Sequence, residues 1–163
     1  MKAKKYVASL LVLMVCLVTS VAFASSGKFK ILDAITAARA EVPVTATLLG
    51  YQEDGAEVEV LFQDDETFEQ YHVEVILATS KVQEIDIKGA TFVLGSTVVN
   101  KSPEDIRNAL LVVYPTAKDI VITSEYDMNN MYYEAEFRTE KFKGEAKFNP
   151  ATGAMIEREL KYY

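Results

Sequence analysis

The sequence predicts an α+β protein made of two tandem repeats, each with one helix packed on a four-stranded antiparallel sheet. Residues 102–163 carry one amphipathic helical segment followed by four alternating segments, and residues 31–88 repeat this order more weakly. A proline stands at the end of each helical segment, Pro115 in the second copy and Pro43 in the first. Proline cannot continue a helix, so both segments are expected to end there before the strands begin.

The first 24 residues have the pattern of a secretory signal peptide. Lysines at positions 2, 4 and 5 precede an apolar stretch from Val7 to Val18, and Ala22-Phe23-Ala24 matches the small-residue cleavage site. We therefore expect cleavage after Ala24 and export to the bacterial periplasm or the outside of the cell. An uncleaved membrane anchor is the alternative, because the apolar stretch approaches the length of a membrane span. Cleavage would also remove Cys16, the only cysteine, so no disulfide is expected.

The first repeat, residues 31–88, follows a short tail at residues 25–30. Apolar residues at helical spacing predict a helix from Ile31 to Val42. Strands are expected at residues 45–51, 56–62, 71–77 and 83–88, and Asp54-Gly55 suits a tight hairpin between the first two. The acidic run Asp64-Asp65-Glu66 is interpreted as a solvated loop. A calcium site there is the alternative, although the spacing matches no calcium-binding loop.

The second repeat, residues 102–163, has clearer boundaries. Ser102 is a natural N-cap, Pro103 fits the first helical position, and Asp105 can complete a capping box. Strands are expected at residues 119–126, 131–137, 142–148 and 155–162, with a turn at Asn149–Gly153 before the last strand. Residues 89–101, between the repeats, are too apolar for a flexible tether and are expected to form an ordered connector.

Composition limits the partners. The chain has 17 basic and 24 acidic side chains, and loss of three lysines with the signal peptide would change the net charge from −7 to −10. This balance argues against nucleic acid or anionic lipid as a partner. No segment after residue 24 is long and apolar enough to cross a membrane, so we expect no stable membrane insertion after cleavage.

The second repeat resembles the PepSY domain. The residues that carry the resemblance, in order, are Tyr114-Pro115-Thr116-Ala117, Tyr132-Tyr133-Glu134-Ala135-Glu136-Phe137 and Phe148-Asn149-Pro150-Ala151-Thr152-Gly153. The first repeat matches only through spacing, Pro43 and Ala78-Thr79, and Thr116 and Val44 stand where the family usually has glycine. The resemblance implies two tandem domains with a fold similar to that of the β-lactamase inhibitor protein. It also implies a role in inhibiting or chaperoning a secreted or envelope peptidase.

Residues for catalysis or metal binding are sparse. His72 is the only histidine and falls within a predicted strand, and no G-x-S-x-G elbow is present. A zinc site needs three or four nitrogen or sulfur ligands, which one histidine cannot supply. We therefore expect no catalytic residues, no metal and no cofactor.

Three tyrosines are the predicted partner-binding residues: Tyr132, Tyr162 and Tyr163. Alternation with Tyr133 turns Tyr132 away from the core, and no packing role is evident for the other two. Aromatic side chains beside polar ones are typical of protein interfaces. The sequence thus predicts a non-catalytic protein-binding module. The alternative is a small-ligand carrier that uses a cavity between helix and sheet.

Overall fold

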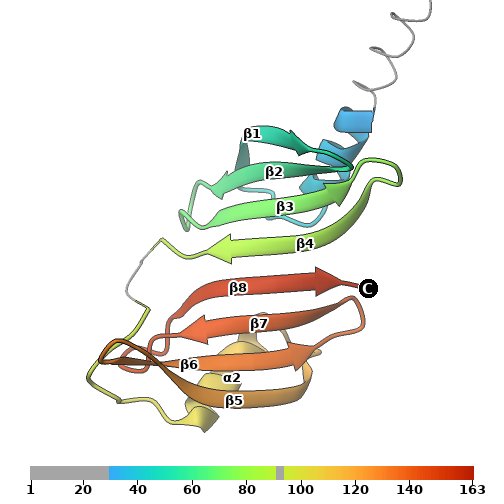
Figure 1. Ribbon diagram of the computed structural model, residues 1–163. Helices are drawn as coiled ribbons and strands as arrows, with labels where there is room; N and C mark the ends of the chain where they lie inside the picture. The colour runs from blue at the N-terminus through green and yellow to red at the C-terminus, as the bar shows by residue number, and fades with distance from the viewer. Residues whose placement is uncertain (1–29, 91–93) are drawn as a thin grey trace, which may run out of the picture.

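The computed structural model describes residues 30–90 and 94–163 (Figure 1). The predicted signal peptide, its cleavage site and most of the predicted tail lie outside the described residues, as do residues 91–93 of the predicted connector. Within the described part, the first helix covers residues 30–39 and α2 covers Pro103–Val113. The strands are β1 (Ala46–Asp54), β2 (Glu57–Asp64), β3 (Gln70–Ile76), β4 (Lys81–Lys88), β5 (Lys118–Asp127), β6 (Asn130–Arg138), β7 (Phe142–Phe148) and β8 (Met155–Tyr162).

All eight strands belong to one antiparallel sheet, so the prediction of two separate four-stranded sheets is wrong. The strand order is β1-β2-β3-β4-β8-β7-β6-β5, and β4 pairs with β8 through partners such as Ile85 with Leu160 and Ile87 with Arg158. The physical reason is that β4 and β8 would each leave a free edge in a separate sheet, and pairing them satisfies both rows of backbone groups. Alternation within a strand carries no information on which strand lies beside it.

The core lies on one face of the sheet, which we call the helix face. Alternate residues of β2, namely Val58, Val60 and Phe62, are buried there. Small and branched side chains of the two helices pack on them and on the equivalent residues of β6, as Ala34 and Leu110 illustrate. Figure 1 shows α2 behind the half of the sheet that contains β5 to β8. Both helices therefore lie on this face, and no described helix or strand covers the opposite face, which we call the open face.

The predicted capping box of α2 is confirmed. The Ser102 hydroxyl accepts a hydrogen bond from the Asp105 amide at 3.2 Å, and the Asp105 carboxylate accepts one from the Ser102 amide at 2.8 Å. These bonds satisfy amide groups that have no partner within the helix itself. The cap fixes where α2 begins, and therefore where its C-terminal end lies over the sheet.

The predicted connector is described at residues 89–90 and 94–101. The Gly89 amide donates to the Ile156 carbonyl at 2.7 Å, Ser96 and Met131 exchange backbone hydrogen bonds, and the amides of Asn100 and Lys101 donate to the Pro150 carbonyl. The described part of this segment is thus bonded to β6, to β8 and to the turn between β7 and β8.

Candidate functional site

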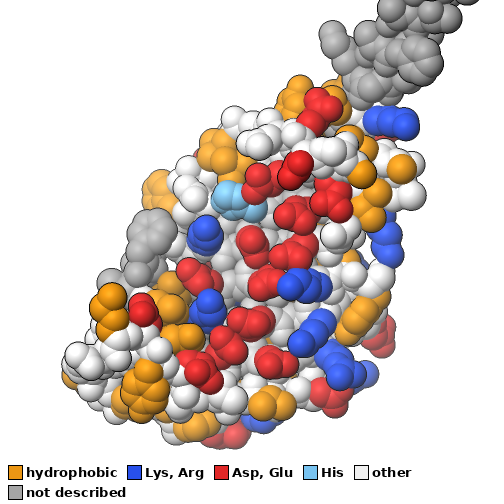
Figure 2. All heavy atoms as spheres, in the orientation of Figure 1, with side chains coloured by type: hydrophobic (Ala, Val, Ile, Leu, Met, Phe, Trp, Pro, Cys, Tyr) orange, Lys and Arg blue, Asp and Glu red, His pale blue; other side chains and the backbone are white. Residues whose placement is uncertain are grey.

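The open face of the sheet concentrates acidic side chains. Figure 2 shows them as a band over the middle of this face. Strand register places carboxylates of seven strands on it, and we call this surface the acidic face; they include Glu57, Glu59, Glu74, Glu84, Asp86, Glu125, Glu134, Glu136, Glu145, Glu157 and Glu159. His72 also lies here, and its Nδ1 is 2.7 Å from Glu59 Oε1. A shallow depression of about 140 Å³ lies over β4, β8 and β7 in the centre of this surface.

A row of four carboxylates crosses the centre of the acidic face. Asp86 on β4 is paired with Glu159 on β8, Glu159 with Glu145 on β7, and Glu145 with Glu136 on β6. Directly opposed side chains in an antiparallel sheet have Cβ atoms about 5 Å apart, and like charges at that distance destabilise the pairing. The row is therefore a feature that opposes folding.

Lysines neutralise only part of this row. Lys161 forms an ion pair with Glu159, and Lys143 Nζ lies 3.3 Å from Glu136 Oε2. Among the described residues, no cation lies within 4.0 Å of the carboxylate of Asp86 or Glu145. Two of the four charges thus lack a close counter-ion.

The pKa values of the acidic face record this crowding. Partial burial, and next the charge of Glu159, raise the pKa of Asp86, whereas the hydrogen bond from Lys161 lowers the pKa of Glu159. Burial is also the first cause of the raised pKa values of Glu74, Glu84 and Glu134, and neighbouring carboxylates add to each. For Glu134 the neighbour with the largest effect is Glu145.

Three of these carboxylates lie close enough to share a cation. Oxygen atoms of Glu84, Asp86 and Glu159 are all within 4.8 Å of one another. Lys161 already serves two of them, because its Nζ is bonded to Glu159 and lies 3.9 Å from Glu84 Oε2. The geometry of this cluster is thus accounted for by a lysine.

Mild acid is expected to stabilise the fold. A raised carboxyl pKa means that the folded state binds the proton more tightly than the unfolded state does. The free energy of unfolding should therefore rise as the pH falls from 7 toward 4.5, which is the ordinary pKa of glutamate. The trend should reverse below pH 3.8, which is the ordinary pKa of aspartate, because Asp64 has a folded pKa of about 2. The stability that its charged carboxylate contributes is lost as that group becomes protonated. Urea unfolding between pH 7 and pH 2 measures this curve.

The control for this prediction is Asp86→Asn/Glu145→Gln. The charged groups around Asp86 are His72 on β3, Glu84 and Lys88 on β4, and Glu159 and Lys161 on β8. The double variant should be more stable than the wild type by about 1 kcal/mol at pH 7, and its rise toward pH 4.5 should be smaller. His72→Gln in the same background isolates the carboxylates, because it removes the imidazole that lies against Glu59. A steady loss of stability from pH 7 downward would contradict the prediction.

A groove crosses the helix face above the join between β4 and β8. It has a volume of about 570 Å³, and we call it the seam groove. The residues that line it come from the C-terminal ends of both helices, the turn between β6 and β7, and the strands below: Glu41, Pro43, Tyr71, Ile87, Val113, Tyr114, Pro115, Thr116, Thr139, Glu140, Lys141, Phe142, Arg158, Leu160 and Tyr162. The predicted alternative placed a cavity between helix and sheet, and this groove is lined by the ends of both helices and by the strands beneath them.

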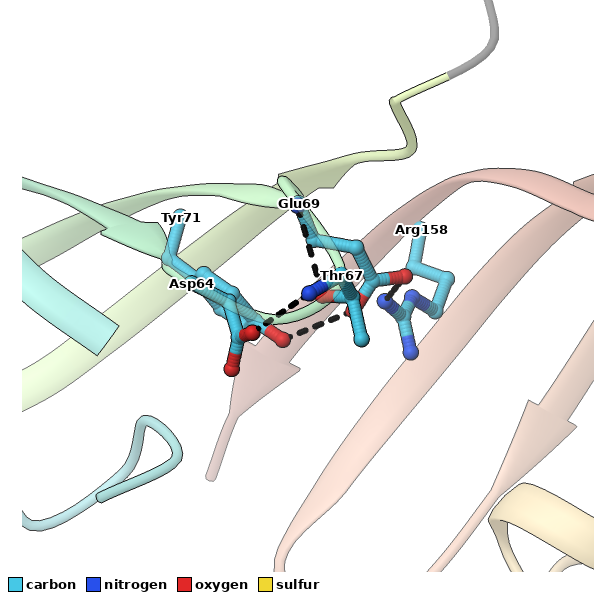
Figure 3. Close-up of polar contacts among 5 residues, drawn as sticks. All are labelled: Asp64, Thr67, Glu69, Tyr71 and Arg158. Carbon is cyan, nitrogen blue, oxygen red and sulfur yellow. Dashed lines mark hydrogen bonds and ion pairs between the residues drawn. The ribbon is translucent and has the colours of Figure 1, made fainter. Parts of the chain in front are cut away.

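Arg158, which lines the seam groove, forms an ion pair with Glu69. Figure 3 shows Arg158 on β8 and Glu69, just before β3, pointing toward each other. Arg158 Nη2 donates to Glu69 Oε1, and the Tyr71 hydroxyl donates to Glu69 Oε2 at 2.8 Å. The Arg158 side chain is only 11 % exposed. This contact joins the two halves of the sheet beneath the groove.

The acidic run Asp64-Asp65-Glu66 is only partly the solvated loop that the sequence predicts. Asp64 is 3 % exposed, and its carboxylate accepts hydrogen bonds from the amides of Glu66 and Thr67 and from the Thr45 hydroxyl (Figure 3 shows the contact with Thr67). A short aspartate side chain can reach the amides two and three residues on, which organises the turn. These bonds, first that of Thr45, lower the pKa of Asp64 to about 2.

The three predicted tyrosines do not form one surface. Tyr132 is half-buried on the open face opposite Glu125 of β5. Tyr162 lies on the helix face, where its ring centroid is 5.4 Å from that of Phe142 and its hydroxyl donates to Glu41 at 2.8 Å. Tyr163 is 61 % exposed. Register also separates them along the sheet, because Tyr162 pairs with the first residue of β7 and Tyr133, next to Tyr132, pairs with the last.

No protein family model, no curated protein and no solved structure matches this chain. The PepSY resemblance therefore stays a prediction from the motifs alone. Neither helix, over the part of the chain that the structure describes, is long and apolar enough to span a membrane.

Proposed function

We propose that this chain is an exported, non-catalytic protein-binding module whose acidic face binds a basic surface of a partner protein. The observation that carries the proposal is the row Asp86, Glu159, Glu145 and Glu136, in which like charges oppose one another across four adjacent strands. Folding alone does not account for such a row, since it opposes strand pairing. A partner that presents lysine or arginine side chains would neutralise it.

The position of the row supports the same function. Both helices pack on the other face, so a partner can approach the acidic face without displacing any described helix or strand. A surface of one sign also steers an oppositely charged partner and raises its association rate. The PepSY resemblance makes a secreted or envelope peptidase the first partner to test. The predicted signal peptide places that encounter in the periplasm or outside the cell.

A small-ligand carrier is the second candidate function. The observation that favours it is the seam groove, whose volume of about 570 Å³ falls within the usual range for small-molecule sites. A carrier would retain a ligand through purification, and its binding would not depend on the acidic face. Mass spectrometry of the purified protein under native conditions distinguishes the two candidates.

The protein-binding function is tested by capture of an envelope partner, followed by titration of the purified partner. Asp86→Asn/Glu145→Gln should weaken binding by at least about tenfold, equivalent to 1.4 kcal/mol, and wild-type binding should weaken as salt is added. The matched control is Glu53→Gln/Glu66→Gln, which removes two exposed acids outside the acidic face. Since the double variant should be the more stable protein, its loss of binding would not reflect misfolding. Equal affinity of the wild type and the double variant would refute the proposal.

A further inference from the structure

Two tyrosine–glutamate pairs of the same construction lie at the seam groove, which Tyr71, Tyr162 and Glu41 line directly. At one end the Tyr71 hydroxyl donates to Glu69 Oε2 at 2.8 Å, and at the other the Tyr162 hydroxyl donates to Glu41 Oε2 at 2.8 Å. In the first pair the remaining oxygen, Glu69 Oε1, accepts a hydrogen bond from Arg158. In the second pair, Glu41 Oε1 has no hydrogen-bond or ion-pair partner among residues 30–90 and 94–163. The second pair thus repeats the first without a guanidinium.

Aromatic rings lie beside the pair formed by Tyr162 and Glu41. The ring centroids of Phe142 and Tyr162 are 5.4 Å apart, and those of Phe142 and Tyr114 are 5.8 Å apart. All three residues line the groove together with Glu41. Aromatic faces attract cations, and the planar guanidinium of arginine stacks on them better than a lysine ammonium does.

The electrostatics of the groove also favour a cation. Its charged lining residues are Glu41, Glu140, Lys141 and Arg158, and Arg158 is already neutralised by Glu69. Residues that end both helices form its rim, and α2 has no basic residue in its last turn. The C-terminal end of a helix carries a partial negative charge, which attracts positive groups. Among the described residues that line the groove, two carboxylates and two helix ends therefore face one lysine, Lys141, that forms no ion pair.

We propose that the seam groove binds an arginine side chain of a partner protein, with Glu41 Oε1 accepting from the guanidinium and the rings of Tyr162 and Phe142 packing on its plane. The hydrogen bonds that Glu69 accepts from Arg158 and from Tyr71 are the internal precedent for this chemistry. The groove lies on the helix face and the acidic face on the other side of the sheet. The site is thus separate from the surface on which the proposed function rests, and either proposal can fail alone.

The test is a titration with the capped peptide acetyl-Gly-Arg-Gly-amide. Binding is monitored through the NMR chemical shifts of the aromatic rings. Shifts should appear at Tyr162, Phe142 and Tyr114, and the same peptide with citrulline, which has the shape of arginine without its charge, should bind at least about tenfold more weakly. The lysine peptide should also be weaker, because an ammonium cannot stack as a plane. Free arginine should bind less well than the peptide if the ligand is a protein side chain.

Variants locate the contact. Glu41→Gln should weaken binding of the arginine peptide about tenfold, whereas Glu53→Gln, which removes an exposed acid of β1, should not change it. Asp86→Asn/Glu145→Gln should also leave the affinity unchanged, which separates the groove from general attraction to the acidic face. Equal binding of arginine and citrulline peptides, an affinity indifferent to Glu41→Gln, or shifts confined to the acidic face would each overturn the proposal. Tighter binding of free arginine than of the peptide would overturn the assignment to a protein side chain.

Discussion

Glu69→Gln is expected to lower the free energy of unfolding by about 2–3 kcal/mol. The substitution leaves Arg158, whose side chain is 11 % exposed, without the carboxylate that neutralises it. Removal of one partner from a buried ion pair is strongly destabilising because the remaining charge stays buried. The loss should be at or below the lower end of the range that is usual when a buried ion pair is broken, because the side chain of Glu69 is 25 % exposed. Urea unfolding at pH 7 measures it.

Glu41→Gln is the matched control for this prediction. It makes the same chemical change at a glutamate that also accepts a hydrogen bond from a tyrosine but forms no ion pair with a described residue. The loss in the free energy of unfolding should therefore be well under half of the loss in Glu69→Gln. The double variant Glu69→Leu/Arg158→Met should recover most of the loss, because apolar side chains of similar volume can replace a buried ion pair. Similar losses in Glu69→Gln and Glu41→Gln would show that the ion pair does not hold the join between β4 and β8.

The sequence predicted elements whose signals are local. Alternation identified the strands, and Ser102, Pro103 and Asp105 identified where α2 begins, because a cap and an alternating face depend only on neighbours in the chain. The single sheet was missed because the pairing of β4 with β8 joins residues far apart in the chain, as Ile85 and Leu160 show. Nothing in either strand specifies the other as its neighbour.

The candidate sites follow the same distinction. The acidic row becomes visible only once the strand order places Asp86 beside Glu159 and Glu145 beside Glu136. One signal for the seam groove was present in the sequence, since Arg158 occupies an apolar-face position between Ile156 and Leu160. An arginine at such a position needs a buried acid as its partner, and Glu69 could not be identified without the fold.

Gly144→Ala is expected to lower the free energy of unfolding by about 2–3 kcal/mol, an effect typical of an overpacked core. A Cβ atom at Gly144 would lie 2.3 Å from Cζ of Phe137, closer than real contacts allow, so the ring would have to move. Phe137 is 1 % exposed and has little room to do so. Thermal and urea unfolding measure the loss, and Gly50→Ala is the control, because a Cβ there meets no atom within 4 Å.

The same substitution should also change the seam groove. The ring centroid of Phe137 is 4.9 Å from that of Tyr114 and 6.2 Å from that of Phe142, so a displaced Phe137 pushes on two aromatic residues that line the groove. Aromatic chemical shifts of Tyr114 and Phe142 should therefore move in Gly144→Ala and stay in place in Gly50→Ala. Affinity for the arginine peptide should fall under conditions in which circular dichroism shows both variants to be folded, and the acidic face should keep its affinity for a basic partner. An unchanged Tyr114 signal, or equal stability of the two variants, would contradict the prediction. It would show that a Cβ atom at position 144 does not displace Phe137 against the residues that line the groove.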